Sequence, residues 1–248
     1  MTPQDMTLNE TQIRIDLVAA IRLSCRNEWH EGVANHFSAA VSADGRKFLV
    51  NPRWVHWSRV RASDLVLCDA DDPSTMERAD APDPSAWSIH SALHRNLPQA
   101  RVALHIHPPH ATALCGLKDP TIYPIDQVTA RFHKRMAYDM AFGGIASEGE
   151  EGERIASTVG NHRSVIMQNH GVTTLGASVA EAWDALYHLE RAAKTLLLAY
   201  STGQPLQVMP DELAEETASE WETYRDAEFA HFAEMKRVLD KEEPDYKD

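Results

Sequence analysis

The spacing of apolar residues predicts an amphipathic helix close to the start of the chain. One face of this helix, at helical intervals, carries Ile13, Leu17, Ala20, Ile21 and Ser24. Three short β-rich stretches follow at residues 36–42, 47–50 and 65–69, and Asp44-Gly45 is the expected turn between the first two. Together these stretches predict a meander of strands.

Further helices and strands follow from the same pattern. Asp83 or Ser85 can cap a helix through residues 87–93 that Pro98 ends, and strands are expected at 101–107, 164–169 and 172–176. Ser178 and Glu181 form a predicted capping box for the longest helix, which runs toward residue 203. The apolar stripe of that helix consists of Ala182, Leu186, Leu189, Ala193 and Leu196. Strands mixed with helices in one unit indicate an α/β sheet covered by helices.

The chain after about residue 210 is acidic but still patterned. Helical spacing relates Trp221, Tyr224, Phe232, Met235 and Leu239. This spacing is typical of a docking helix with a solvated acidic face, and the stripe would need a partner surface if the core is already complete. Residues 242–248 look disordered. With no repeat or linker visible, we expect residues 1–248 to form one domain with a helical acidic C-terminal extension.

Composition narrows the classes of function. The 248 residues are 43% hydrophobic, enough for one buried core, and Asp plus Glu exceed Lys plus Arg by 37 to 24. Without a basic stretch, nucleic acid and membranes are not expected partners. The start of the chain shows no leader pattern, so we expect a cytoplasmic protein. Cys25, Cys68 and Cys115 are widely separated and suit core thiols in a reducing compartment.

Three histidines carry the candidate chemistry. The strand period of two places His105 and His107 on one face, and His170 ends a predicted strand, where Gly171 would permit a tight turn. Neutral imidazole is a common ligand of a divalent metal ion such as Zn, Mn, Fe or Co. The competing interpretation is that His105 and His107 are two ordinary histidines among thirteen. Spacing by itself leaves both interpretations open.

Several ordered segments resemble the class II aldolase/adducin family. They are residues 101–115 (RVALHIHPPHATALC), 164–176 (SVIMQNHGVTTLG) and 178–194, and residues 31–41 and 124–144 resemble its adducin-like branch. The resemblance covers about residues 10 to 210. It implies an α/β/α sandwich with a largely antiparallel central sheet, a cyclic homotetramer, and a divalent metal held by His105, His107 and His170.

The chain departs from the sugar-phosphate aldolases of this family at their acid/base and phosphate positions. Ala86 stands where those enzymes carry a glutamate, and His36, Arg53 and Trp54 stand where small residues cradle phosphate. A non-phosphorylated substrate is therefore expected. Arg53 could bind its carboxylate as a two-pronged donor, and Trp54 or Trp57 could form an apolar wall. Alternatively, Arg53 makes a surface ion pair and the tryptophans are core.

Other residues are candidates for catalysis or substrate binding. His90 and His94 lie four positions apart on one helix face. Related enzymes carry a histidine that matches His90. This residue could orient a metal ligand, move a proton, or be a buried histidine with satisfied hydrogen bonds. Gln127, expected to bind substrate, lies in the segment where the aldolases have a tyrosine. Tyr138 or His133 could replace that tyrosine, unless Tyr138 only packs.

Three functions compete at this stage. The first is a metal-dependent lyase that cleaves a carbon–carbon bond of a small carboxylic acid through an enolate, by decarboxylation or retro-aldol cleavage. The absence of the glutamate favours decarboxylation, which requires no base for a hydroxyl proton. The second is a non-haem iron oxygenase with three histidines. The third is a non-catalytic scaffold like the adducin head, and retention of all three histidines counts against it.

Overall fold

A mixed sheet forms the centre of the computed structural model, which describes residues 10–144, 149–224 and 226–248. Within these residues the strand order is β3-β2-β1-β4-β7-β6-β5, and every pair is antiparallel except β5 with β6. The strands are β1 (His36–Ala40), β2 (Lys47–Val50), β3 (Val66–Asp69), β4 (Val102–Ile106), β5 (Met136–Asp139), β6 (Ser164–Met167) and β7 (Gly171–Gly176). The predicted β meander and the largely antiparallel sheet are confirmed.

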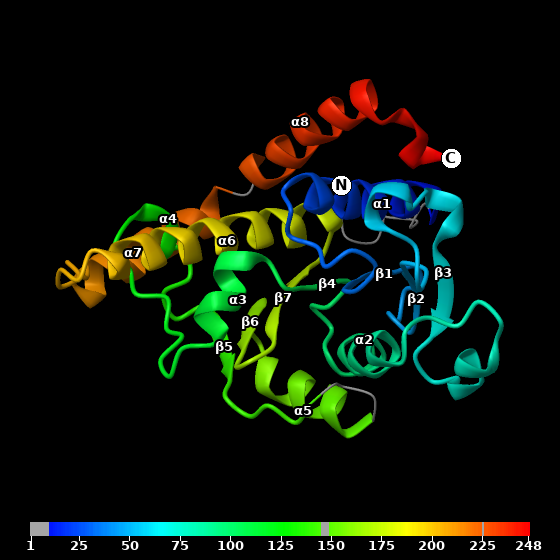
Figure 1. Cartoon of the computed structure of the whole chain (residues 1–248), viewed down its shortest axis with the longest axis horizontal. Coiled ribbons are helices and arrows are strands. Elements are labelled where there is room, and N and C mark those ends of the chain that lie inside the picture. The colour runs from blue at the N-terminus through cyan, green and yellow to red at the C-terminus, as the bar shows by residue number, and fades with distance from the viewer. Residues whose placement is uncertain (1–9, 145–148, 225) are drawn as a thin grey trace.

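Helices cover both faces of the sheet (Figure 1). One face carries α1 (Glu10–Arg26), α3 (Pro109–Cys115) and α6 (Val179–Ser201), and the other carries α2 (Pro84–Asn96) and α5 (Gly149–Val159). Alternation along β4 separates the two cores, because Leu104 and Ile106 pack toward α1 and α6 while Ala103 packs toward α2 and α5. His105 therefore faces the side of α2. The predicted α/β/α sandwich is confirmed.

Short helices and caps complete this layer arrangement. The short elements are α4 (Gln127–Ala130), η1 (Trp57–Arg59), η2 (Ala62–Asp64) and η3 (Pro73–Glu77). Asp83 caps α2 by accepting a hydrogen bond from the Ser85 amide. Ser178 caps α6 by accepting from the Glu181 amide, but the Glu181 carboxylate accepts from the Ala177 amide at 2.8 Å. The predicted capping box is thus only half formed.

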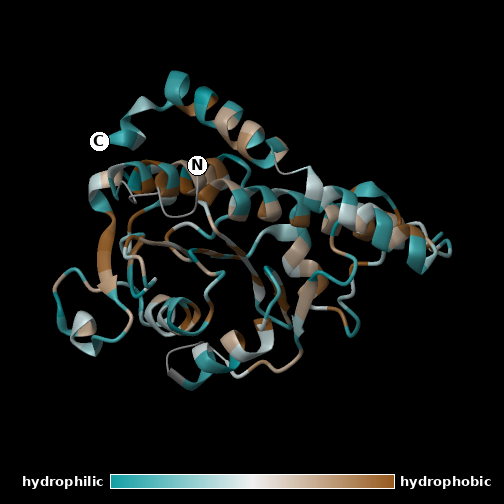
Figure 2. Cartoon of the chain, turned by 180° about the vertical axis from the view of Figure 1, so that it is seen from behind, coloured by the Kyte–Doolittle hydropathy of each residue, from teal (hydrophilic) through white to brown (hydrophobic). Residues whose placement is uncertain are grey.

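The C-terminal segment differs from the single docking helix that its stripe suggested. It forms α7 (Asp211–Thr223) and α8 (Asp226–Glu242), and α8 lies over α1 and α6 (Figure 1). Phe232 and Leu239 are buried within the chain, whereas Tyr224 is 67% exposed. Figure 2 shows hydrophobic residues concentrated along α1 and β3, and a mixture along α8. This chain itself covers much of the stripe, which therefore no longer argues for an oligomer.

The last residues are ordered, contrary to expectation. Residues Pro244–Lys247 form a 3₁₀ turn, η4, in which Tyr246 is fully buried. Arg22 in α1 donates to the carboxylates of Glu243 at 3.2 Å and Asp245 at 3.0 Å. The disorder prediction failed because the local composition is polar, while the partner that fixes this segment lies more than 200 positions earlier in the chain.

Two of the three cysteines are core thiols. Cys68 and Cys115 are buried, and burial raises the pKa of each thiol to about 12. Cys25 is partly buried, packs against the edge of the main core and lies beside His30, so the prediction of a core thiol holds only in part for Cys25. Among the described helices, none has both the length and the apolar content needed to cross a membrane. Residues 1–9, on which the expectation of no leader depends, lie outside the described residues.

Candidate metal centre

His105, His107 and His170 meet at one end of β4 and β7. His105 is 1% exposed on β4, His107 follows the end of that strand, and His170 lies in the turn between β6 and β7. The Nε2 atoms of His105 and His107 are 3.2 Å apart. The ring of His170 is centred 4.8 Å from that of His105 and 5.0 Å from that of His107. One donor atom from each histidine lies within 4.8 Å of the other two.

The turn before β7 makes room for this cluster. The sequence predicted that Gly171 would permit the turn, but Asn169 adopts the left-handed conformation there, with φ 57°. Gly171 serves a different purpose, because a Cβ atom at this position would lie 2.3 Å from Cδ2 of His107. Only glycine therefore allows the His107 ring to sit against the start of β7.

Neighbouring side chains orient the imidazoles. Nδ1 of His107 lies 2.6 Å from a carboxylate oxygen of Glu31, and Nδ1 of His105 lies 3.1 Å from the hydroxyl of Thr173. Because a carboxylate only accepts, His107 donates through Nδ1 and keeps the lone pair of Nε2 free toward the cluster. Glu31 could not be predicted from the sequence, because it lies in the loop after α1, where no periodicity indicates the direction of a side chain.

Burial keeps two of these imidazoles neutral. Burial, aided by the surrounding histidines, lowers the pKa of His105 well below its ordinary value and that of His170 to about 4. Neutral imidazole is the form that binds a metal ion. Convergent nitrogen donors, a carboxylate behind His107 and a glycine that makes room for its ring fit the divalent metal that the family resemblance implies.

A pocket of about 510 Å³ opens beside the three histidines. Its wall includes His36, Arg53, Trp54 and Ala86, the four positions at which the sequence leads us to expect a departure from the sugar-phosphate aldolases. Nε of Arg53 lies 3.4 Å from a carboxylate oxygen of Asp83, and the guanidinium lies 4.5 Å from the centre of the Trp54 ring. Arg53 thus lines the pocket and also makes the ion pair of the alternative interpretation.

The two tryptophans have different environments. Trp54 is 66% exposed and holds a left-handed backbone with φ 64°, a conformation that bulky residues rarely adopt. Such strain is often found at functional sites. Trp57 is fully buried, with its ring centred 4.8 Å from that of Phe37. Trp57 is therefore a core residue, and the proposal that it walls the pocket is wrong.

Other candidate residues lie away from this pocket. The hydroxyl of Tyr138 accepts from the Ile122 amide at 3.1 Å, and Tyr138 packs on the α6 side of the sheet, opposite to the side that His105 faces. His133 pairs with Asp211 at 3.1 Å. Gln127 begins α4, where its carbonyl accepts from the Trp221 indole at 2.9 Å. The fold therefore does not bring Tyr138, His133 or Gln127 to this chain's own pocket.

His90 is fully buried in a chain of hydrogen bonds behind the pocket. Nε2 of His90 lies 2.9 Å from Nδ1 of His36, and the Ser38 hydroxyl bridges Nδ1 of His90 and Nε2 of His94. Nδ1 of His94 lies 2.8 Å from the carbonyl oxygen of Ala100. Burial lowers the pKa of His36 and His94 to about 3 and that of His90 well below its usual range, so the three rings are neutral.

This chain of bonds has one direction. The Ala100 carbonyl only accepts, so His94 donates through Nδ1 and accepts at Nε2 from the Ser38 hydroxyl. Ser38 then accepts from Nδ1 of His90, and His90 accepts at Nε2 from Nδ1 of His36. His36 is left with an Nε2 lone pair on the pocket side. His90 thus positions His36, and the prediction that His90 is itself catalytic is not supported by its location.

The pocket end of the chain involves two further residues. Nε2 of His36 lies 3.2 Å from the Ser85 hydroxyl, which lies 2.6 Å from a carboxylate oxygen of Asp83. The single Ser85 proton can be donated to either neighbour. His36 also stacks on His105, with ring centres 4.8 Å apart. The acceptor nitrogen of His36 is therefore held beside the histidine cluster.

Comparison with known proteins agrees with this architecture. Residues 15–197 match the model of the class II aldolase and adducin N-terminal domain. A Caulobacter vibrioides protein named only as an aldolase class 2 protein is 30% identical over 207 residues, which are 84% of this chain and 80% of that protein. The crystal structure of an aldolase II superfamily protein from Pseudomonas syringae superimposes with a TM-score of 0.87 at 30% identity, covering 100% of this chain and 98% of that one.

Two more distant relatives have names that state a reaction. The decarboxylase NovR of Streptomyces niveus is 25% identical over 204 residues, which are 79% of this chain and 74% of that protein. A 4-hydroxy-3-prenylphenylpyruvate oxygenase/4-hydroxy-3-prenylbenzoate synthase of Streptomyces roseochromogenus is 24% identical over 204 residues, which are 79% of this chain and 72% of that protein. The matched domain, the sequence identities and the shared fold agree with one another. The chain belongs to the class II aldolase/adducin family.

Proposed function

We propose that the chain is a metal-dependent lyase that cleaves a carbon–carbon bond of a small, non-phosphorylated carboxylic acid, with decarboxylation favoured over retro-aldol cleavage. The observation that carries this proposal is the wall of the 510 Å³ pocket. Ala86 replaces the acid/base glutamate, and His36, Arg53 and Trp54 replace small residues that cradle phosphate. The decarboxylase among the relatives agrees with this proposal.

The three histidines, Arg53 and Trp54 each have a role in this proposal. His105, His107 and His170 would hold a divalent metal, which when bound supplies Lewis-acid polarisation of a substrate carbonyl or carboxylate. Arg53 binds the substrate carboxylate through the edge of its guanidinium that does not face Asp83. The exposed Trp54 ring provides an apolar wall for the rest of the substrate.

His36 has the task of hydrogen bonding on the metal side of the pocket. Its Nε2 lone pair can accept a hydrogen bond from a substrate hydroxyl or carboxylic acid, or from Ser85. The carbon that loses carbon dioxide needs a proton, and the Ser85 hydroxyl between His36 and Asp83 is the proposed relay. Ser85 passes its proton to that carbon while a solvent water in the open pocket gives one to Ser85, so that no serine alkoxide forms beside Asp83.

The non-haem iron oxygenase is the second candidate. Three histidines with alanine at position 86 leave coordination positions for a substrate and oxygen, and one relative is named as an oxygenase. Oxygen consumption distinguishes the two chemistries, because decarboxylation without oxidation releases carbon dioxide and takes up no oxygen.

We propose further that the protein forms a homotetramer and acts in the cytoplasm. Light scattering on the purified protein tests the assembly.

The function is tested by supplying zinc, manganese, iron or cobalt to the purified protein and screening aromatic and keto carboxylic acids beside ketose 1-phosphates. Carbon dioxide release and oxygen uptake are recorded in parallel. The expected result is release from a carboxylic acid without oxygen uptake, abolished in His105→Ala. Arg53→Lys keeps the charge but not the two-pronged donor, so we expect a raised KM. Turnover of the sugar phosphates alone would contradict the proposal.

A further inference from the structure

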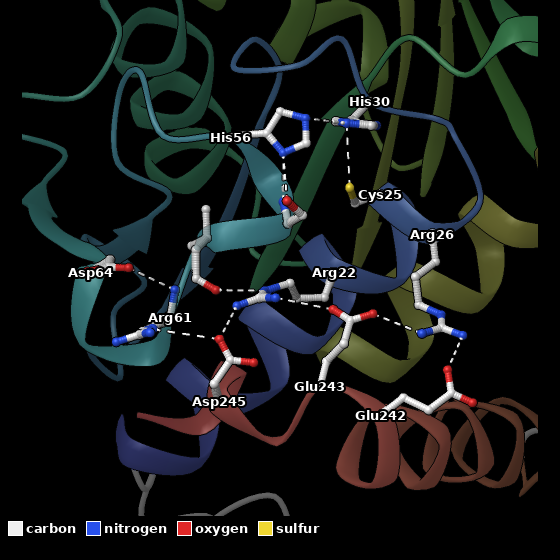
Figure 3. A network of polar contacts seen from close by, with 12 residues as sticks. Arg22, Cys25, Arg26, His30, His56, Arg61, Asp64, Glu242, Glu243 and Asp245 are labelled. Carbon is white, nitrogen blue, oxygen red and sulfur yellow. Dashed lines mark hydrogen bonds and ion pairs between the residues drawn. The ribbon is translucent and has the colours of Figure 1, made fainter.

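A second cluster of metal-binding side chains lies outside the pocket, at the C-terminal end of α1. Figure 3 shows Cys25 from α1, His30 from the loop that follows and His56 from the segment before η1 pointing toward one another. Sγ of Cys25 lies 3.5 Å from Nε2 of His30, and Nε2 of His30 lies 3.3 Å from Nε2 of His56. One donor atom from each residue lies within 4.8 Å of the other two.

We propose that Cys25, His30 and His56 form a second metal site, for zinc or a similar borderline-soft divalent cation, that clamps the loops beside the pocket. Zinc bonds of about 2.3 Å to sulfur and 2.0–2.1 Å to nitrogen, at tetrahedral angles, put sulfur and nitrogen about 3.6 Å apart and two nitrogens about 3.3 Å apart. The two measured separations match these values. The His105 and His107 nitrogens, 3.2 Å apart, have the same spacing.

The ring of His30 is aimed at the centre of the cluster. Within the described residues, its Nδ1 atom is buried without a hydrogen-bond partner. Its Nε2 atom instead has two neighbours, Sγ of Cys25 and Nε2 of His56. The lone pair or single proton of that nitrogen is poorly matched to both contacts together. A metal ion bound to all three donor atoms resolves this mismatch.

Metal binding at this site requires two proton rearrangements. Burial raises the pKa of the Cys25 thiol, so the thiol enters protonated and releases its proton to solvent as the metal–sulfur bond forms. Nδ1 of His56 lies 2.8 Å from the Ser58 hydroxyl and accepts from the Ser58 amide at 3.2 Å. On ligation through Nε2, Nδ1 carries the proton and donates to the hydroxyl, and the longer contact with the amide is given up. Because His56 is exposed to solvent, a water molecule can take the fourth coordination position of the metal ion.

The site would join segments that build the pocket. The loop that carries His30 continues to Glu31 and Asn35, and the segment that carries His56 begins with Arg53 and Trp54. All four of these residues line the pocket beside the three-histidine cluster. A metal ion bridging α1 and the two segments therefore restricts the pocket wall. Bound to the folded chain and not to the unfolded one, it also stabilises the fold.

Cobalt(II) provides the sharpest test, because thiolate ligation produces a sulfur-to-cobalt charge-transfer absorption in the near ultraviolet and a site made of histidines does not. The metal-free full-length protein is titrated with cobalt(II) and then with zinc(II). We expect two equivalents per chain and a charge-transfer band for the wild type. Cys25→Ser and His56→Ala should lose the band and one equivalent, while His105→Ala should lose one equivalent and keep the band.

Cys68→Ala is the matched control, because Cys68 is buried away from the cluster and should leave the band unchanged. Zinc should also raise the Tm of His105→Ala but not that of the double variant His105→Ala/His56→Ala. Absence of the band at saturating cobalt, or its persistence in Cys25→Ser, would overturn the inference. Either result leaves the function proposed for the three-histidine site untouched, since that site contains no thiol.

Discussion

Nδ1 of His107 lies 2.6 Å from the carboxylate of Glu31, a residue 76 positions earlier in the chain. This bond fixes which nitrogen of His107 faces His105 and His170. We predict that Glu31→Ala weakens metal binding about 10-fold to 100-fold without unfolding the protein. Competition with a metal-sensitive dye measures the affinity. Glu28→Ala, in the same loop, is the control, and equal affinities in the two variants would remove Glu31 from the site.

Ser38 has an analogous role for His36. Ser38→Ala removes the hydroxyl between His90 and His94, which leaves a buried donor on His90 unpaired at a cost of about 1–3 kcal/mol. We expect His36 to change from a single tautomer protonated at Nδ1 to a mixture. Nitrogen-15 NMR of the histidine rings reports the tautomer directly. Ser91→Ala is the control, since the Ser91 hydroxyl is buried without a partner among the described residues.

Restoring glutamate at position 86 tests the inferred substrate class. Ala86→Glu places a carboxylate where a carboxylated substrate must approach, and at ~4 Å and an effective dielectric near 20 the repulsion is roughly 4 kcal/mol before relaxation. Even a fraction of that energy weakens substrate binding many-fold. We expect impaired activity on the native acid and no efficient cleavage of ketose 1-phosphates, compared at equal metal loading. A variant that cleaves sugar phosphates and keeps its native rate would disprove the inference.

Asp184 in α6 accepts a hydrogen bond from His231 in α8 and so links the two helices. Burial by itself raises the pKa of this carboxylate, but hydrogen bonds from His188 and His231 and the charge of Arg131 outweigh burial, and the net pKa is well below its usual range. A group whose folded-state pKa is lowered stabilises the fold above its unfolded pKa, about 3.9, and loses this contribution as pH falls through the folded value.

We therefore expect Asp184→Asn to lower the free energy of unfolding by about 3–5 kcal/mol at pH 7, because the largely buried Arg131 guanidinium loses its ion pair with Asp184 and keeps the one with Glu228. The difference from the wild type should stay constant down to about pH 4 and shrink below it. Urea unfolding across that range measures both. Asp211→Asn, an exposed partner of Lys134, should behave like the wild type. A difference that grows on acidification would contradict this assignment.

Local patterns predicted the features that depend on local geometry. The strand period put His105 and Ile106 on opposite faces of the sheet, and both lie there. Tyr138 lies on the α6 side of the sheet. Alternation along its strand says which residues share a face with Tyr138, but the sequence does not say which face of an edge strand lies on the side of the pocket. The sequence by itself therefore could not exclude Tyr138. Knowing the pairing of β5 with β6 would have settled this.

Features that depend on distant contacts were missed or wrongly assigned. Glu31 reaches His107 from an irregular loop, and the ordered turn around Tyr246 depends on Arg22 in the first helix. The sequence does not show that Cys25 has a polar neighbourhood, because His30 and His56 come close to it only when a loop and a later segment return to α1. In each case the deciding partner is set by tertiary structure, on which a local pattern carries no information.

If His105, His107 and His170 hold a metal ion, each of the three alanine variants must lose it, and the metal content of the purified variants shows whether they do. Every variant is purified metal-free, loaded with zinc and analysed in the Cys25→Ser background, which removes the second proposed site. We expect the parent to retain one equivalent and each of His105→Ala, His107→Ala and His170→Ala to retain none while staying folded by circular dichroism. One full equivalent in any of the three would exclude that histidine from the site.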